Sequence, residues 1–219
     1  MHESSYEREP GYALRYRDRR FQTHSGAGTD RRERRALRAL LAAVPRDDTA
    51  AAPNRPWLDV PSGAGRLTEE LPGPAVRVDR DPEMVRAADS RSPRACASVH
   101  ALPFAASSFE GVLCMRLLQH IGSAEERTTI LRELGRVSER WLIVSFFDAL
   151  SLQHLRRRLR RVRRKRPSGR FAVRRSAFAA ELREAGWQVL HFRPLRRFVG
   201  EQTLLLCAKA AEIETKRRR

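Results

Sequence analysis

Two carboxylates and two glycines follow neighbouring apolar runs, at a spacing that suits a ligand site. In WLDVPSGAGR, an apolar run that begins at Trp57 ends at Asp59, and Gly63 and Gly65 follow. Glycine allows a tight turn that brings backbone N–H groups close to a ligand. A second apolar run, AVRVD, ends at Asp79. Ligands of parallel α/β sheets bind beyond the carboxyl ends of the strands, so we expect both carboxylates at one site.

These carboxylates indicate the class of ligand. Asp79, 14 residues after Gly65, is placed to accept hydrogen bonds from both hydroxyls of a ribose. The alternative, that Asp79 caps the next helix, is weakened because Asp81 can fill that role. A dinucleotide fingerprint would need a third glycine where Thr68 stands. A carboxylate at Asp59 would repel a pyrophosphate but suits an ammonium and a sulfonium, which predicts S-adenosylmethionine as the cofactor.

The apolar pattern predicts the elements that position this site. Short apolar runs alternate with helical stripes from residue 56 onward, which indicates one α/β domain with a doubly wound, mostly parallel sheet. Strands are expected at 56–60, 75–79, 95–99, 111–115, 141–147, 187–192 and 202–209. Helices are expected from a capping box at Asp30 and Glu33, from Gly65 to about 72, after Asp81, after Ser123, within 150–166 and at 176–185.

The domain organisation follows from the same pattern. Residues 1–28 are interpreted as a basic extension or lid, 29–210 as the domain and 211–219 as a basic tail. A basic helical insertion is expected at about 150–170. The aromatic residues of the extension either fold over the site or anchor the segment to the domain; they are Tyr12, Tyr16 and Phe21, with His24 beside them.

The charge of the chain points to an anionic partner. Lys and Arg number 44 against 26 Asp and Glu, a formal charge of +18, although a genomic bias toward arginine is an alternative cause. Nine of the eleven residues at 156–166 are basic, with leucines along one side of the expected helix. Such a helix suits anionic lipid headgroups; RNA phosphate and a solvated lid helix are the alternatives. Because this run lacks aromatic residues for base stacking, we favour a small anionic or lipid-linked partner over RNA.

The remaining composition bears on location. Three separated cysteines fit reduced, buried side chains with neither a disulfide framework nor a zinc site. The polar N-terminal segment is unlike a secretory signal, and no apolar run approaches the roughly 20 residues of a membrane span. We therefore expect a cytoplasmic protein, with peripheral membrane contact through 156–166 left open.

Four motifs, in order, resemble those of class I S-adenosylmethionine-dependent methyltransferases. WLDVPSGAGRLTEEL resembles the first motif and AVRVDRDPEMVRAA the second. HALPFAASSFEGVLCMRLLQHI is similar to the third and fourth, and ERTTILRELGRVSERWLIVSFFD to the helix and fifth strand of the same family. The resemblance implies a Rossmann-like sheet of seven strands with the last one antiparallel.

The resemblance also implies roles for individual residues. Asp59 and the glycine turn would hold the methionine part of the cofactor, and Asp79 the ribose. Met84 would flank the adenine, with a place in the helix core as the alternative. Many relatives have an aspartate four residues before the LPF sequence; here Ser98 stands there, so its hydroxyl and the backbone of Val99 are the expected adenine contacts.

Methyl transfer is an in-line displacement in which the enzyme mainly aligns the acceptor, and a general base is needed only for a protonated acceptor. His120, after the fourth strand, is the candidate base, with simple packing as its alternative. Arg116 would pair either with an anionic substrate or with a surface carboxylate. We expect a methyltransferase for an anionic small molecule or a lipid- or glycolipid-linked acceptor. An RNA (tRNA) methyltransferase and a noncatalytic binding protein are the alternatives.

Overall fold

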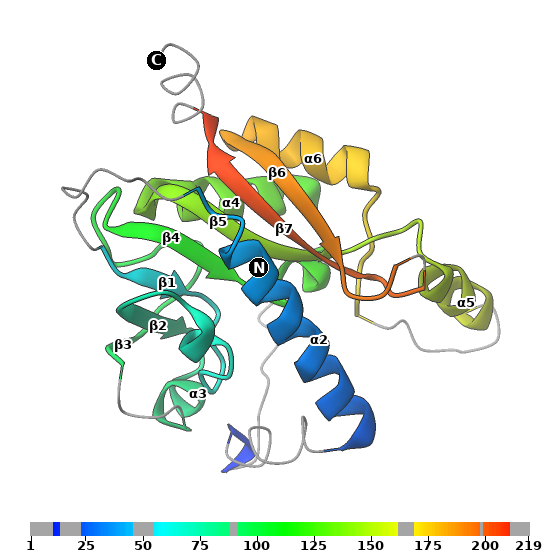
Figure 1. Cartoon of the computed structure of the whole chain (residues 1–219), viewed down its shortest axis with the longest axis horizontal. Helices are drawn as coiled ribbons and strands as arrows, with labels where there is room; N and C mark the ends of the chain where they lie inside the picture. The colour runs from blue at the N-terminus through cyan, green and yellow to red at the C-terminus, as the bar shows by residue number, and fades with distance from the viewer. Residues whose placement is uncertain are drawn as a thin grey trace.

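The computed structural model describes residues 11–13, 23–45, 55–87, 92–161, 169–197 and 199–210. These residues form a seven-stranded sheet with helices on both faces (Figure 1). The strands are β1 (Trp57–Asp59), β2 (Ala75–Asp79), β3 (Arg94–Cys96), β4 (Phe109–Cys114), β5 (Ser138–Phe147), β6 (Trp187–Pro194) and β7 (Gln202–Lys209). The helices are α2 (His24–Leu41), α3 (Pro82–Ala87), α4 (Ala124–Val137), α5 (Leu152–Arg161) and α6 (Arg175–Glu184), with short 3-10 turns η1 (Thr68–Glu70) and η2 (Leu118–His120).

The strand order is β3-β2-β1-β4-β5-β7-β6. Strands β1 to β5 run parallel, and β7 is inserted antiparallel between β5 and β6. The carboxyl ends of β1, β2, β4 and β5 therefore meet along one edge of the sheet, where β7 begins. The predicted doubly wound sheet with an antiparallel last strand is confirmed.

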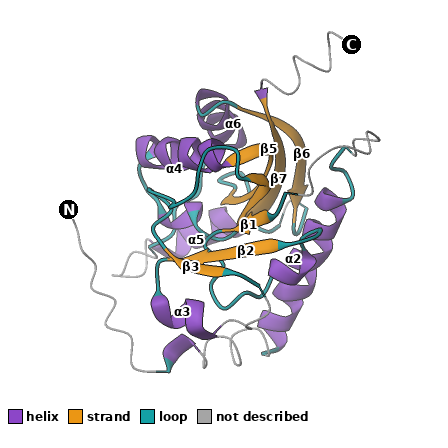
Figure 2. Ribbon diagram, turned by 90° about the vertical axis from the view of Figure 1, so that its left-hand side faces the viewer, coloured by secondary structure: helices purple, strands orange, loops and turns teal. Residues whose placement is uncertain are grey.

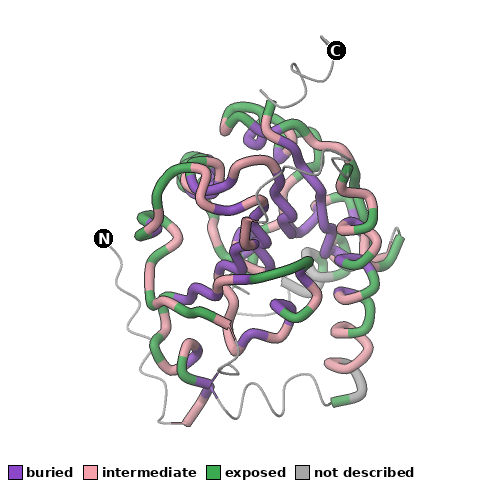
Figure 3. Tube along the Cα trace, turned by 60° about the vertical axis from the view of Figure 1, so that its left-hand side comes forward, coloured by how far each residue is buried: buried purple, intermediate pink, exposed green. Residues whose placement is uncertain are grey.

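Alternating side chains of the strands build a separate apolar core on each face. On one face, Leu142 and Val144 of β5 pack with α4 and α6. On the other, Trp141 and Ile143 pack with Leu37 and its neighbours on α2. The buried positions gather along the central strands (Figure 3), and Figure 2 shows the helices on either side of the sheet. The two cores fix the sheet edge that carries the candidate site.

The helix expected after the glycine turn does not form. Only the 3-10 turn η1 follows Gly65, whose φ of +78° is left-handed. The Pro72-Gly73-Pro74 sequence then ends the segment, since proline lacks an N–H and disfavours helix at the residue before it. The helix after Asp81 and the helix after Ser123 form as predicted, each with the expected side chain accepting an N–H of the first turn.

The N-terminal helix begins earlier than the sequence indicated. Thr23 is its N-cap, with the hydroxyl accepting the N–H of Gly26 at 3.2 Å, so the expected capping box at Asp30 and Glu33 is wrong. The expected domain start at residue 29 lies inside α2. Residues 1–10, 14–22 and 211–219, which make up most of the predicted extension and all of the predicted tail, lie outside the described residues.

Two further findings concern features that the sequence singled out. Cys114 and Cys207 are buried, and burial raises the pKa of both thiols, whereas Cys96 is exposed, contrary to expectation. Within the described ranges, no helix combines the length and apolar character needed to cross a membrane. The same residues bring together no cluster of side chains suited to hold a metal ion.

Glu33 of α2 is fully buried and joins three other segments. Its carboxylate accepts the Nε2–H of Gln202 at 2.7 Å and the Nη1–H of Arg116 at 3.2 Å. Arg66, just after the glycine turn, is paired with the same carboxylate. Helix α2 therefore clamps the turn after β1, the loop after β4 and the start of β7 through one side chain.

We expect Glu33→Gln to lower the free energy of unfolding by about 2 kcal/mol, because two arginines lose their shared counter-charge. The loss stays below that of a fully buried pair, since the side chains of Arg66 and Arg116 are 18% and 22% exposed. Urea denaturation would measure it. Glu69→Gln, the same change at an exposed glutamate, should shift the value by less than about 0.5 kcal/mol. Equal effects of the two substitutions would contradict the clamp.

Candidate functional site

Asp59 and Asp79 end two adjacent parallel strands, as the sequence predicted. Both are buried, with 2% and 8% of their surface exposed. One oxygen of Asp79, Oδ2, accepts the N–H of Gly63 at 2.8 Å, and the other accepts the N–H of Asp81 at 3.0 Å. A carboxylate has about four lone-pair sites, so an oxygen that accepts a backbone N–H can also accept a ligand hydroxyl. The side chain of Asp79 thus joins β2 to the glycine turn that follows β1.

Burial and most neighbouring groups shift the pKa of the Asp59 carboxylate in opposite directions. Burial raises its pKa to about 7, and the nearby Asp79 carboxylate adds to the rise. A hydrogen bond from the Thr68 hydroxyl, 2.6 Å long, and the charges of Arg66 and Arg77 act in the opposite direction. A cationic group placed beside Asp59 would favour its ionised form. The residue therefore fits an ammonium or sulfonium ligand.

The glycine turn leaves open space where a ligand would lie. Gly63 has a φ of +54°, a left-handed conformation that other residues rarely adopt. A Cβ built at Gly63 would meet nothing within 4 Å, so the volume above this backbone is not filled by the described chain. The N–H of Ser62 donates to the carbonyl of Val78 at 2.8 Å, which holds the turn against β2. The turn is therefore fixed in position with its outer side open.

The residues expected near an adenine lie beside this turn or after β3. Met84 of α3 is buried in a small cluster with Ala13, and Tyr12 and Ala64 of the turn pack against it. The N-terminal segment that contains Tyr12 therefore contacts the site, while Tyr16 and Phe21 lie outside the described residues. The structure thus places Met84 in a packed cluster and leaves its contact with an adenine a prediction.

Ser98 and Val99 are placed differently from each other. Ser98 is exposed, and its hydroxyl accepts the N–H of His100 at 3.3 Å within a turn. Val99 is half-buried against the core that α4 covers. An adenine contact by Ser98 therefore has to share the hydroxyl with this turn.

Of the two candidates after β4, Arg116 has a structural partner. Its backbone, with a φ of +60°, donates an N–H to the Ser145 hydroxyl at 2.8 Å, and its guanidinium binds Glu33. The carboxylate partner is buried rather than on the surface, which corrects the expectation of a surface pair. His120 is exposed at the end of η2. His120 is thus exposed and Arg116 is paired with Glu33, and a catalytic role for either residue stays a prediction.

Two contributors to the site, Thr68 and Glu33, were missed at the level of sequence. Thr68 was noted only for not being glycine, yet it binds Asp59. Gln119, a polar candidate of the loop after β4, is buried with its Nε2–H donated to the carbonyl of Arg116, and its Oε1 has no hydrogen-bond partner among the described residues. Glu33 lies four residues before Leu37 on the apolar side of α2, and a carboxylate in that register was the available signal for a buried role.

The geometry can now be compared with known proteins. A family model described as a methyltransferase domain matches residues 58–140, the segment that contains Asp59, the glycine turn, Asp79 and the loop after β4. This match agrees with the resemblance of the four sequence motifs to class I S-adenosylmethionine-dependent methyltransferases. No curated protein sequence matches the chain.

Solved structures share its fold. The magnesium protoporphyrin IX methyltransferase of Synechocystis PCC 6803, with bound S-adenosylhomocysteine, has a TM-score of 0.69 at 14% identity, over 85% of this chain and 87% of that one. A possible histamine N-methyltransferase from Thermotoga maritima has a TM-score of 0.59 at 14% identity, over 83% and 91%. A putative methyltransferase from Haloferax volcanii, solved with the Trm112 activator, has a TM-score of 0.64 at 16% identity, over 91% and 95%. At these identities the likeness establishes the fold alone.

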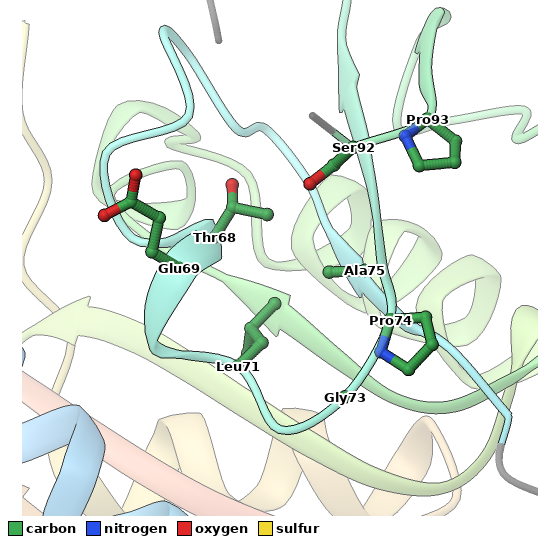
Figure 4. A pocket seen from close by; sticks show the side chains of 8 residues that line it. All are labelled: Thr68, Glu69, Leu71, Gly73, Pro74, Ala75, Ser92 and Pro93. Atoms are coloured by element: carbon green, nitrogen blue, oxygen red, sulfur yellow. The ribbon is translucent and has the colours of Figure 1, made fainter. Parts of the chain in front are cut away.

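A pocket at the opposite end of β2 is a separate feature of the methyltransferase. It is lined by the amino ends of β2 and β3, including Pro74, Ala75 and Pro93, with Glu69 at its rim (Figure 4). Because ligands of this sheet type bind at the carboxyl ends of the strands, we do not assign the cofactor to it.

We expect Asp59→Asn to stabilise the ligand-free methyltransferase increasingly as the pH rises. The folded-state pKa of about 7 exceeds the ordinary value of 3.8, so the native state holds an extra proton between these pH values and loses stability as the pH rises through them. The advantage of asparagine should therefore grow by about 2 kcal/mol between pH 5 and pH 8. Chemical denaturation at the two pH values would measure it. Asp81→Asn, an equivalent change beside the site, should show no such growth; an equal effect there would refute the assignment to Asp59.

Proposed function

We propose that this methyltransferase binds S-adenosylmethionine at the carboxyl ends of β1 and β2 and methylates an anionic small molecule or a lipid-linked acceptor. The observation that carries the proposal is a pair of buried carboxylates, Asp59 and Asp79, on either side of an open glycine turn. The hydrogen bond from the Gly63 N–H to Asp79 joins this turn to the second carboxylate.

The residues fit the parts of the cofactor. When bound, S-adenosylmethionine supplies a methyl group on a sulfonium that is already an activated leaving group. Asp59 offers a carboxylate whose ionised form gains from a neighbouring ammonium. Asp79 offers oxygens that can accept the ribose hydroxyls, and Gly63 allows close approach to the backbone. Met84 offers an apolar surface beside the turn.

The acceptor side is the loop after β4. Residues 116–122 lie at the same edge of the sheet, and the N–H of Phe171 donates to the carbonyl of Gln119 at 2.7 Å. The Phe171 ring lies so close to Gly122 that a Cβ there would meet it at 2.9 Å. The chain that returns from the basic insertion therefore covers this loop. We assign His120 as the base for an acceptor that must lose a proton.

The charge supports an anionic acceptor. In the sequence, the basic segment 156–166 stands between β5 and the residues near Phe171 that contact the acceptor loop, so an anionic acceptor suits the positive charge of this part of the chain. The same charge would serve an RNA acceptor, which therefore stays the second candidate.

We expect Asp79→Ala to abolish cofactor binding, because the ribose hydroxyls and the Gly63 N–H both lose their acceptor. Isothermal titration calorimetry with S-adenosylmethionine would measure it. Asp79→Asn, which keeps one carbonyl oxygen, should weaken binding about tenfold, and Asp81→Asn, which still caps α3, should leave it unchanged. Undiminished binding by a folded Asp79→Ala protein would exclude this site.

The acceptor class can be tested with methyl-labelled cofactor and fractionated cell extract. We expect label in a lipid or an anionic small-molecule fraction, with none transferred by Asp79→Ala. Label in RNA would replace the proposed acceptor with the second candidate. Cofactor binding without transfer to any fraction would favour a noncatalytic protein.

A further inference from the structure

Helix α5 turns its apolar side toward solvent. Leu152, Leu155 and Leu159 recur at intervals of three and four residues, so they lie along one side of the helix. Their exposed fractions are 41%, 51% and 63%, and Leu150 just before the helix is 72% exposed. We call these four residues the leucine stripe.

Other helices of the chain bury their apolar side. Ile130, Leu131 and Leu134 of α4 are each fully buried against the sheet. Among the described residues, six large apolar side chains are exposed, and four of them form the leucine stripe. Such a concentration at α5 and the residue just before it indicates a contact surface rather than scattered exposure.

The polar side of α5 is the side that is anchored. The N–H of Gln153 donates to the carbonyl of Val199 at 3.0 Å, and its Oε1 accepts the N–H of Glu201 at 3.4 Å. His154 Nδ1 lies 3.7 Å from Glu201 Oε1. The side chains of Gln153 and His154 therefore contact the protein, whereas the leucines of the stripe face away from it. Figure 1 shows α5 projecting at the end of the sheet away from β3.

The positive charge next to the leucine stripe indicates which kind of partner would bind there. Arg156 is exposed, and the segment 156–166 contains nine basic residues and no acidic one. A helix with an apolar side between cationic side chains lies in the plane of an anionic lipid surface, with its apolar residues at the boundary of headgroups and acyl chains. RNA would use the arginines but leave the leucines in water.

We infer that α5 docks on an anionic lipid bilayer through the leucine stripe, and that the exposed Arg156 and the positive charge of the sequence 156–166 attract it to the headgroups. The docked helix shares the carboxyl edge of the sheet with the acceptor loop. Asp148, at the end of β5, forms a bridge with Val173, and Phe171 bonds to Gln119, so both ends of the insertion are attached at this edge. Docking therefore brings the acceptor loop to the bilayer surface. That the acceptor is lipid-linked rests on the proposed function, whereas the docking does not.

Vesicle flotation of the full chain tests the docking. The probes are vesicles of phosphatidylcholine alone and of phosphatidylcholine with phosphatidylglycerol. We expect binding only to the anionic vesicles, and about tenfold weaker binding for the double variant Leu155→Glu/Leu159→Glu. Gln188→Glu/Phe192→Glu, two exposed positions on β6, adds the same two charges elsewhere and should bind as the parent does. Because all four side chains are exposed, circular dichroism should show both double variants folded.

Three outcomes would overturn the inference: no binding to anionic vesicles, equal binding to both kinds of vesicle, or equal weakening by the two double variants. If the protein binds no vesicles but is retained on tRNA, and the leucine substitutions leave that retention unchanged, the segment binds RNA instead. Calorimetry on the same preparations separates the two proposals. Cofactor binding without vesicle binding overturns the docking alone, and vesicle binding without cofactor binding overturns the methyltransferase site alone.

Discussion

The shared pairing of Glu33 with Arg66, Arg116 and Gln202 is the constraint on which the site depends. These four residues come from α2, the glycine turn, the loop after β4 and the start of β7, and only the folded chain brings them together. Arg66 follows the turn proposed to hold the cofactor, and Arg116 begins the loop proposed to face the acceptor. One buried carboxylate thereby fixes the distance between the two halves of the site, which is what an in-line displacement needs from its enzyme.

The second constraint is the desolvation of Asp59. A carboxylate in water would bind a cation weakly, because solvent already stabilises its charge. Burial between the strands removes that stabilisation, and the Thr68 hydroxyl and two arginines restore only part of it, so the pKa stays near 7. The free energy that desolvation of the Asp59 carboxylate costs in the ligand-free state is therefore recovered when a cation binds beside it. Discrimination in favour of a charged sulfur compound follows from this balance.

Local patterns predicted much of the fold and the cofactor side of the site. β2 and β7 have the bounds that apolar runs predicted, and Asp81 and Ser123 cap their helices, because strand periodicity and capping depend on near neighbours in sequence. The helix after Gly65 was wrongly predicted, since a left-handed glycine and two prolines outweighed its apolar residues. Asp30 and Glu33 were misread as a cap, and the partner of Arg116 was open, because the pairs of Arg66 with both carboxylates and of Arg116 with Glu33 join residues 33 to 83 positions apart.

The short 3-10 turn after Gly65 has a consequence for ligand choice. In a dinucleotide-binding fold, the pyrophosphate binds at the N-terminus of a long helix. The aligned peptide dipoles of that helix present a positive potential to the anion. With only three residues in η1, that positive pole is not built at this position. The short turn therefore disfavours a pyrophosphate at this position, in the same direction as the carboxylate of Asp59.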